Sequence, residues 1–167
     1  AHCANVVCSE ASNVTVVDST REGGRDDTVY GAGRGSSIVL GVDGLGLISY
    51  INSEKLYIAH CLNKDCSIQE KTSETPSDQV HGKISIAVDS WGYPLIAYGV
   101  SSSANNNNLV LITCQNLACT DHNFFRFDES TNVEVFHSVS IGVDGFGVIA
   151  YYDESNKDLK IANCSDR

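Results

Sequence analysis

The chain has 167 residues, of which 42% are apolar and 19% charged, and only two prolines. This composition excludes an intrinsically disordered chain and predicts one domain, over residues 1–167, with a buried core. The net charge of −10, with 11 dispersed Lys and Arg residues, lacks the basic patch that a nucleic-acid partner needs. No apolar run reaches the roughly eighteen residues of a membrane-spanning helix, so we expect no membrane span.

Cysteine spacing is the first pattern met along the chain. Six of the seven cysteines form three pairs with the same four-residue gap: Cys3 with Cys8, Cys61 with Cys66, and Cys114 with Cys119. Paired spacing of this kind predicts three local disulfides and an oxidising compartment, and a tetrahedral zinc site is the alternative. The remaining Cys164 opens a fourth copy of the motif. It is a candidate thiol for an intermolecular bond.

Apolar, β-branched stretches separated by turn residues predict strands, without a helical period. In chain order we expect a strand at Asn13–Asp18, a hairpin over Ser37–Tyr50, strands at Lys55–His60 and 68–72, a hairpin over Ile84–Tyr98, strands at Asn108–Thr113 and Asn123–Asp128, a hairpin over Val139–Tyr151, and a strand at Asp158–Asn163. The elements repeat in units of approximately 3–60, 61–113 and 114–164. The hairpins align on Asp43, Asp89 and Asp144, with a wider turn after Asp89. One aspartate per turn is too few oxygen ligands for calcium, so we expect these residues to shape turns.

The repeated pattern S-I-x-V-D-G-x-G-x-x-I-x-Y-Y-D, followed by L-K-I-A-x-C-x-N-x-x-C, resembles the blade repeat of bacterial secreted β-propellers over essentially the whole chain. The resemblance implies an all-β fold of three four-stranded antiparallel propeller-like blades, each with its first strand at the centre and its fourth outside. The chain starts with an outer strand and ends with three inner ones. We therefore expect Asn13–Asp18, from the same chain or a neighbour, to complete the blade of residues 139–164. A β-trefoil-like threefold fold is the alternative.

No catalytic motif is present, and we expect no enzyme activity, no cofactor and no metal site. In a propeller, a set of residues near the mouth of the central channel forms a candidate ligand face: Arg34, His81, His137, Tyr50, Tyr98, Tyr151 and Asp153. The tyrosines recur with the second strand of each unit, so packing between blades explains them as well. Two N-x-S/T sequons make Asn13 and Asn163 candidate glycosylation sites.

Together these features predict a secreted, extracellular, non-enzymatic structural protein. Its main predicted function is self-assembly, in which a strand of one chain completes the last blade of another. The product is a homo-oligomer with a closed ring of blades or a filament. The alternative function is a carbohydrate-binding, lectin-like β-propeller module, with a glycan as the partner.

Overall fold

The computed structural model describes residues 2–3, 11–19, 31–74, 79–101, 107–127 and 133–165. These ranges contain strands and turns but no helix, and accordingly no helix that is long and apolar enough to cross a membrane. The strands form three antiparallel sheets, two with four strands and one with three, and a two-stranded pair near the N-terminus. The protein is therefore all-β, as the sequence predicts.

Strands that are consecutive in the chain pair within each sheet, so every connection inside a sheet is a hairpin. The first sheet contains β3 (Arg34–Leu40), β4 (Gly46–Asn52), β5 (Lys55–Cys61) and β6 (Gln69–Glu74). The second contains β7 (Gln79–Val88), β8 (Pro94–Ser101), β9 (Asn107–Cys114) and β10 (His122–Phe127). The third contains β11 (Val133–Ile141), β12 (Gly147–Asp153) and β13 (Asp158–Asn163), and the small pair is β1 (His2–Cys3) with β2 (Ala11–Asn13).

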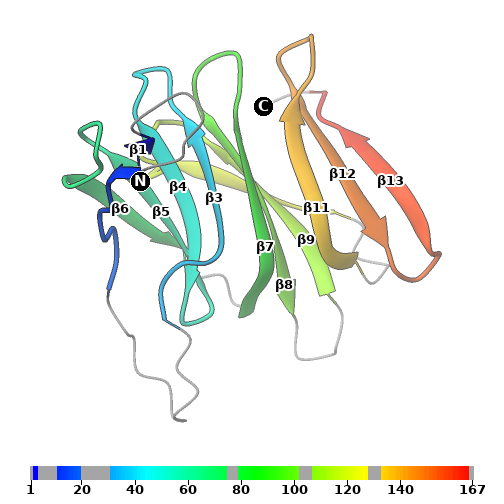
Figure 1. Cartoon of the computed structure of the whole chain (residues 1–167). Helices are drawn as coiled ribbons and strands as arrows, with labels where there is room; N and C mark the ends of the chain where they lie inside the picture. The colour runs from blue at the N-terminus through cyan, green and yellow to red at the C-terminus, as the bar shows by residue number, and fades with distance from the viewer. Residues whose placement is uncertain are drawn as a thin grey trace.

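The second sheet lies between the other two (Figure 1). Its first strand, β7, contacts β3 on one side and β11 on the other. One apolar core fills the space between the first and second sheets and includes Leu47, Leu56 and Tyr98. Another lies between the second and third sheets and includes Leu111 and Ile149. In the described part of the chain the sheets thus form an open row, and no closed threefold arrangement of the β-trefoil kind is present.

Two glycines set the close approach of the first and second sheets. Gly35 in β3 and Gly82 in β7 both lie at register shifts of their strands and both have positive φ, 61° and 77°. A Cβ atom on Gly35 would collide with the carbonyl oxygen of Gly82. Because glycine has no Cβ, the two inner strands can approach each other here at backbone distance.

The hairpin turns that join the first two strands of each sheet share one geometry. Gly44, Gly92 and Gly145 have φ between 75° and 91°. The amide of each glycine donates to the carbonyl three residues before it, on Gly41, Asp89 and Gly142 respectively. This is the pattern of a tight turn followed by a left-handed residue. Asp89 therefore corresponds to Gly41 and Gly142, and not to Asp43 and Asp144; the predicted alignment of the three aspartates, and the wider second turn, were wrong.

Disulfides close the loop after the third strand in the first two sheets. The bonds are Cys61–Cys66 and Cys114–Cys119, with Cα–Cα distances of 4.7 Å and 4.9 Å. In the first loop Asn63 Oδ1 accepts a hydrogen bond from the amide of Ile68, and in the second Asn116 Oδ1 accepts one from Thr120. The asparagine of the repeated motif therefore braces the loop. The predicted Cys3–Cys8 bond lies outside the described residues.

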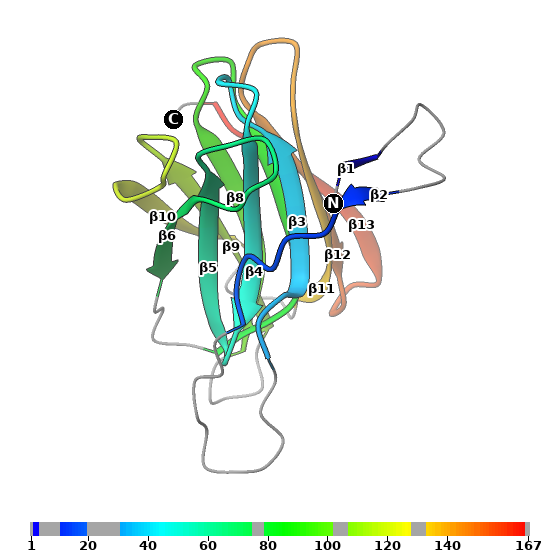
Figure 2. The same ribbon diagram turned by 60° about the vertical axis from the view of Figure 1, so that its left-hand side comes forward.

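The N-terminal segment does not complete the third sheet. Ala11–Asn13 pairs with β1, and residues 14–18 lie on the first sheet without regular strand pairing (Figure 2). Tyr50 donates a hydrogen bond of 2.7 Å to Asp18 Oδ2, and Gln69 Nε2 donates one of 2.9 Å to the carbonyl of Val17. Completion of the last blade within the chain is therefore wrong for this structure, because the second sheet separates this segment from β13. Completion by a neighbouring chain stays a prediction.

The glycine contact gives a stability prediction. We expect Gly35→Ala to lower the free energy of unfolding by about 2–4 kcal/mol. Alanine is strained at this positive φ, and its Cβ would also collide with the second sheet, so the two costs add. Gly44→Ala is the matched control, because Gly44 also has positive φ but open space around its Cα; it should cost only about 1 kcal/mol. Urea denaturation measures both. Equal losses in the two variants would contradict the close approach.

Candidate ligand-binding site

The three tyrosines of the predicted ligand face are packed between or against sheets. Tyr50, Tyr98 and Tyr151 occupy the same position of β4, β8 and β12, with exposed fractions of 3%, 0% and 7%. Tyr98 and Tyr151 belong to the two cores between sheets. Burial, together with the hydrogen bond to Asp18, raises the pKa of the Tyr50 hydroxyl, which stays neutral. Tyr50 lines a cavity of about 270 Å³ between the first sheet and residues 15–18, and the three rings do not meet in one groove.

Of the other four residues of that face, His137 lies directly opposite Tyr151 in the third sheet, but the seven residues do not form one site. His137 is buried, and its Nε2 lies 2.9 Å from the carbonyl of Ala97. Burial lowers the pKa of His137, so the neutral ring donates to that carbonyl. Asp153 is also buried; hydrogen bonds from Asn156 and Lys160 hold the pKa of its carboxyl well below the usual range. Arg34 and His81 precede the two touching glycines of the inner strands.

A different site emerges where the second turn departs from the first. In the first sheet, Asp43 Oδ2 lies 2.7 Å from His60 Nε2, so the turn is tied to the end of β5. The amide of Leu45 and His60 both stabilise the carboxylate and lower the pKa of Asp43. In the second sheet Trp91 takes the place of Asp43, and Thr113 takes the place of His60. The indole cannot accept a hydrogen bond, and Thr113 Oγ1 is buried without a hydrogen-bond partner.

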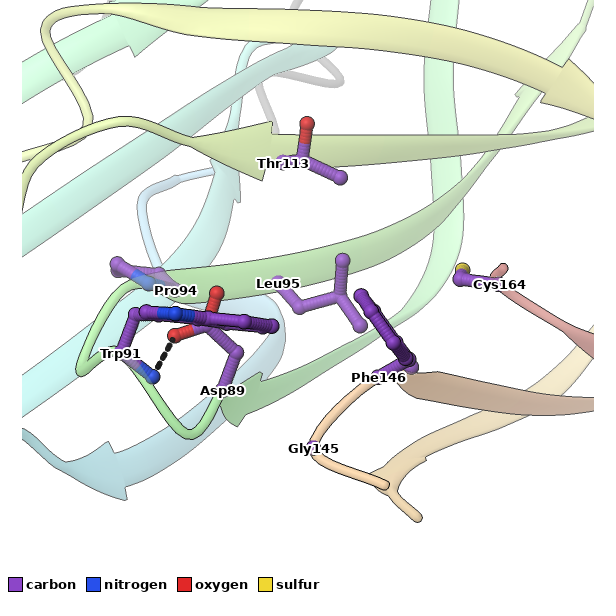
Figure 3. Close-up of a pocket in the computed structure, with 9 residues that line it drawn as sticks. Asp89, Trp91, Pro94, Leu95, Thr113, Gly145, Phe146 and Cys164 are labelled. Atoms are coloured by element: carbon purple, nitrogen blue, oxygen red, sulfur yellow. Dashed lines mark hydrogen bonds between the residues drawn. The ribbon is translucent and has the colours of Figure 1, made fainter. Parts of the chain in front are cut away.

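Trp91 lies at the mouth of a narrow slot between the second and third sheets (Figure 3). Its side chain is 51% exposed, and its ring centroid lies 5.4 Å from that of Phe146 in the facing turn. Asp89 Oδ1 accepts hydrogen bonds of 2.9 Å from the amides of Trp91 and Tyr93, which fixes the turn that carries the indole. Thr113 forms part of the same slot. Trp91 and Phe146 therefore form an aromatic edge of the slot, while the hydroxyl of Thr113 is buried on the side away from the indole (Figure 3).

A second cavity, of about 230 Å³, lies next to the slot on the side of the outer strands. Thr113 and Cys164 line both spaces, so the two are adjacent. Phe125, Phe127 and Arg126 of β10 form the wall from the second sheet. We call the slot and the cavity together the inter-sheet groove. Its volume lies below that of a drug-sized pocket and fits a small ligand.

Two further predicted residues lie on the rim of this groove. Cys164 takes part in neither described disulfide, and a Cβ on Gly147 would lie 3.2 Å from its Sγ. An intermolecular bond through Cys164 stays a prediction. Asn163 is exposed at the end of β13 and lines the cavity, so a glycan on this sequon would obstruct the groove. The side chain of Asn13 lies outside the described residues.

Among the residues described, no three His, Cys, Asp or Glu side chains gather as a metal site requires. The sequence prediction missed Trp91, Phe146 and Thr113 as site residues. The signal that could have found them is the broken repeat, since one turn of the three replaces its aspartate with an indole. The incorrect alignment of Asp89 with Asp43 concealed that replacement.

Comparison with known proteins gives a likeness at the level of fold. No protein-family model and no curated protein sequence matches the chain. Among solved structures, a fucose lectin from Kordia zhangzhouensis, in complex with methyl-fucoside, superposes with a TM-score of 0.52 and 10% sequence identity. The match covers 80% of this chain and 94% of the lectin chain. The arrangement of strands is thus similar in the two chains, and the likeness does not extend to their sequences.

The contacts of Asp153 predict a pH-dependent contribution to stability. The lowered pKa means that the carboxylate stabilises the folded chain at neutral pH and loses this effect as the pH falls below about 4. We expect Asp153→Asn to lower the urea midpoint at pH 7, and the gap from the wild type to narrow at pH 3. Asp158→Asn, on the same hairpin but exposed, serves as control. A gap of equal size at both pH values would contradict this role.

The orphaned hydroxyl of Thr113 gives a second test. We expect Thr113→Val to leave the free energy of unfolding unchanged or to raise it by up to about 1 kcal/mol, because no hydrogen bond is lost. Thr72→Val is the matched control, since Thr72 Oγ1 donates a 2.9 Å bond to the carbonyl of Ala118; it should lose about 1 kcal/mol. If both variants are destabilised alike, Thr113 has a partner in the folded protein.

Proposed function

We propose that this chain is a non-enzymatic carbohydrate-binding protein that holds a sugar ring in the inter-sheet groove. The observation that carries the proposal is the combination of a half-exposed Trp91, at the turn that breaks the repeat, with the unpartnered hydroxyl of Thr113 near the end of β9. About half of the Trp91 side chain faces water, and the buried hydroxyl of Thr113 makes no hydrogen bond. A ligand with an apolar face and several hydroxyl groups would use both.

A sugar ring has these two properties. The C–H groups on one side of the ring pack against an aromatic face, and the hydroxyl groups on its edge donate and accept hydrogen bonds. Trp91 and Phe146 would supply the aromatic face. Thr113, Asp89 and Arg126 would supply the polar contacts, because all three line the groove. The likeness in fold to a fucose lectin supports the same class of ligand.

We propose further that the three sheets are blades of the propeller type. The inner position of β3, β7 and β11, where β7 contacts both neighbours, supports this arrangement. Secretion into an oxidising compartment is part of the same proposal. The two disulfides support it, since such bonds persist mainly outside the reducing cytosol.

Trp91 provides the binding assay, because it is the single tryptophan of the chain. We expect methyl-fucoside or another monosaccharide, such as galactose, mannose or N-acetylglucosamine, to change the fluorescence of Trp91 saturably. A ligand that packs on the ring alters its exposure to water. If no sugar of this panel changes the fluorescence or gives a calorimetric signal at millimolar concentrations, the proposal is wrong.

Variants locate the site by calorimetry. We expect Trp91→Ala and Thr113→Val to weaken binding of the sugar by at least about tenfold, which corresponds to about 1.4 kcal/mol. Phe124→Ala is the matched control, since Phe124 is an aromatic residue of similar exposure, 49%, whose ring packs on His122 and does not line the groove. Equal weakening by the control would place the sugar elsewhere.

A further inference from the structure

The outward face of the third sheet is apolar and uncovered. Ile161 and Leu159 of β13 lie opposite Ala150 and Tyr152 of β12 and point to the same side of the sheet. Their side chains are 64% and 76% exposed. The opposite face of this sheet, with Ile149, is buried against the second sheet. The third sheet therefore has apolar residues on both faces but, within the described ranges, a neighbouring sheet on only one.

The first two sheets show what this face is built to contact. By strand register, Leu56, Leu109 and Leu159 are equivalent, as are Ile58, Leu111 and Ile161. Leu56 and Ile58 are 0% and 1% exposed, because the second sheet covers them. Leu109 and Leu111 are each 1% exposed, because the third sheet covers them. The uncovered face thus corresponds to the face that, in both other sheets, buries itself against the next sheet.

The first sheet has the complementary opening. Ile38, Ile86 and Val139 are equivalent, since each pairs with the isoleucine two residues before the repeated tyrosine. Ile86 and Val139 are 8% and 7% exposed because the preceding sheet covers them, whereas Ile38 is 65% exposed. Residues 14–18 cover this side only in part and leave a cavity of about 270 Å³ in front of Ile48 and Tyr50.

We infer that the outward face of the third sheet docks on the Ile38 face of the first sheet of a second copy of this chain. Around Ile38 and Ile161 the contact repeats the packing that joins the first sheet to the second and the second to the third. Residues 14–18 already cover the Tyr50 side of the first sheet. The contact is heterologous, because the two surfaces differ. Such a contact either closes into a ring or continues as a filament. This inference is independent of sugar binding.

Sedimentation velocity over a range of concentrations tests the inference. We expect the wild-type chain to associate, and Ile161→Lys and Ile38→Lys each to weaken association by at least about tenfold, since each buries an unpaired charge in the contact. Both side chains are exposed in the single chain, so both variants should keep the wild-type circular dichroism spectrum. Val143→Lys is the matched control, because this valine is fully exposed in a turn and belongs to neither face; it should associate like the wild type.

A mixing experiment tests the head-to-tail geometry. The Ile161→Lys variant keeps the Ile38 face of the first sheet intact, and the Ile38→Lys variant keeps the outward face of the third sheet intact. An equimolar mixture of Ile161→Lys and Ile38→Lys should therefore form a discrete heterodimer, although each variant alone stays monomeric. A wild-type chain that remains monomeric at every concentration overturns the inference. So does Ile38→Lys protein that associates like the wild type, because the third sheet would then pair with itself.

Discussion

The fold depends on one constraint, which is that each sheet carries apolar side chains on both faces and needs a neighbour on each side. The second sheet meets this requirement fully, with Tyr98 buried on one face and Leu111 on the other. Burying a Leu or Ile side chain stabilises a protein by about 1.5–3 kcal/mol. The row of sheets forms because this gain recurs at each interface. The two outer faces, at Ile38 and at Ile161, remain exposed, so their apolar side chains do not contribute this burial free energy.

Polar contacts at the edges fix how the sheets sit on one another. Between the first and second sheets, Thr72 donates to the carbonyl of Ala118, and Glu74 lies 3.2 Å from His122. Between the second and third, the amide of Val139 donates to Ser85 Oγ, while His137 contacts Ala97. These bonds lie at equivalent interfaces but use different residues. The apolar packing is therefore the repeated part of the structure, and the polar contacts are specific to each interface.

The candidate groove follows from the same repetition. At a repeated interface, a turn can lose its aspartate without loss of the fold, because the apolar packing remains. The second turn does so at Trp91, and the partner position becomes Thr113, whose hydroxyl is left without a bond. The change costs a hydrogen bond such as Asp43 makes with His60. The same change places an exposed aromatic ring beside the slot between two sheets that Thr113 also lines.

Much of the fold could be predicted from the sequence, because strand periodicity, turn glycines and cysteine spacing are local properties. The three sheets, their antiparallel hairpins and the loops closed at Cys61–Cys66 and Cys114–Cys119 are of this kind. The position of residues 14–18 could not be predicted, since it depends on contacts with Tyr50 and Gln69 far along the chain. The groove was missed for a related reason. In the sequence, the Val-Asp pairs align Asp89 with Asp43 and Asp144. The hydrogen bonds of the turns show instead that Asp89 occupies a position two residues earlier, that of Gly41 and Gly142.

Nuclear magnetic resonance can locate the proposed sugar-binding site at the second turn residue by residue. A chain with a single tryptophan gives one indole N–H signal. On titration with the best-binding sugar, that signal should shift together with the amides of Asp89, Tyr93 and Phe146, while the equivalent turn at Asp43 and Gly44 stays unchanged. Shifts confined to other parts of the chain, with the Trp91 signal unmoved at saturation, would contradict the account.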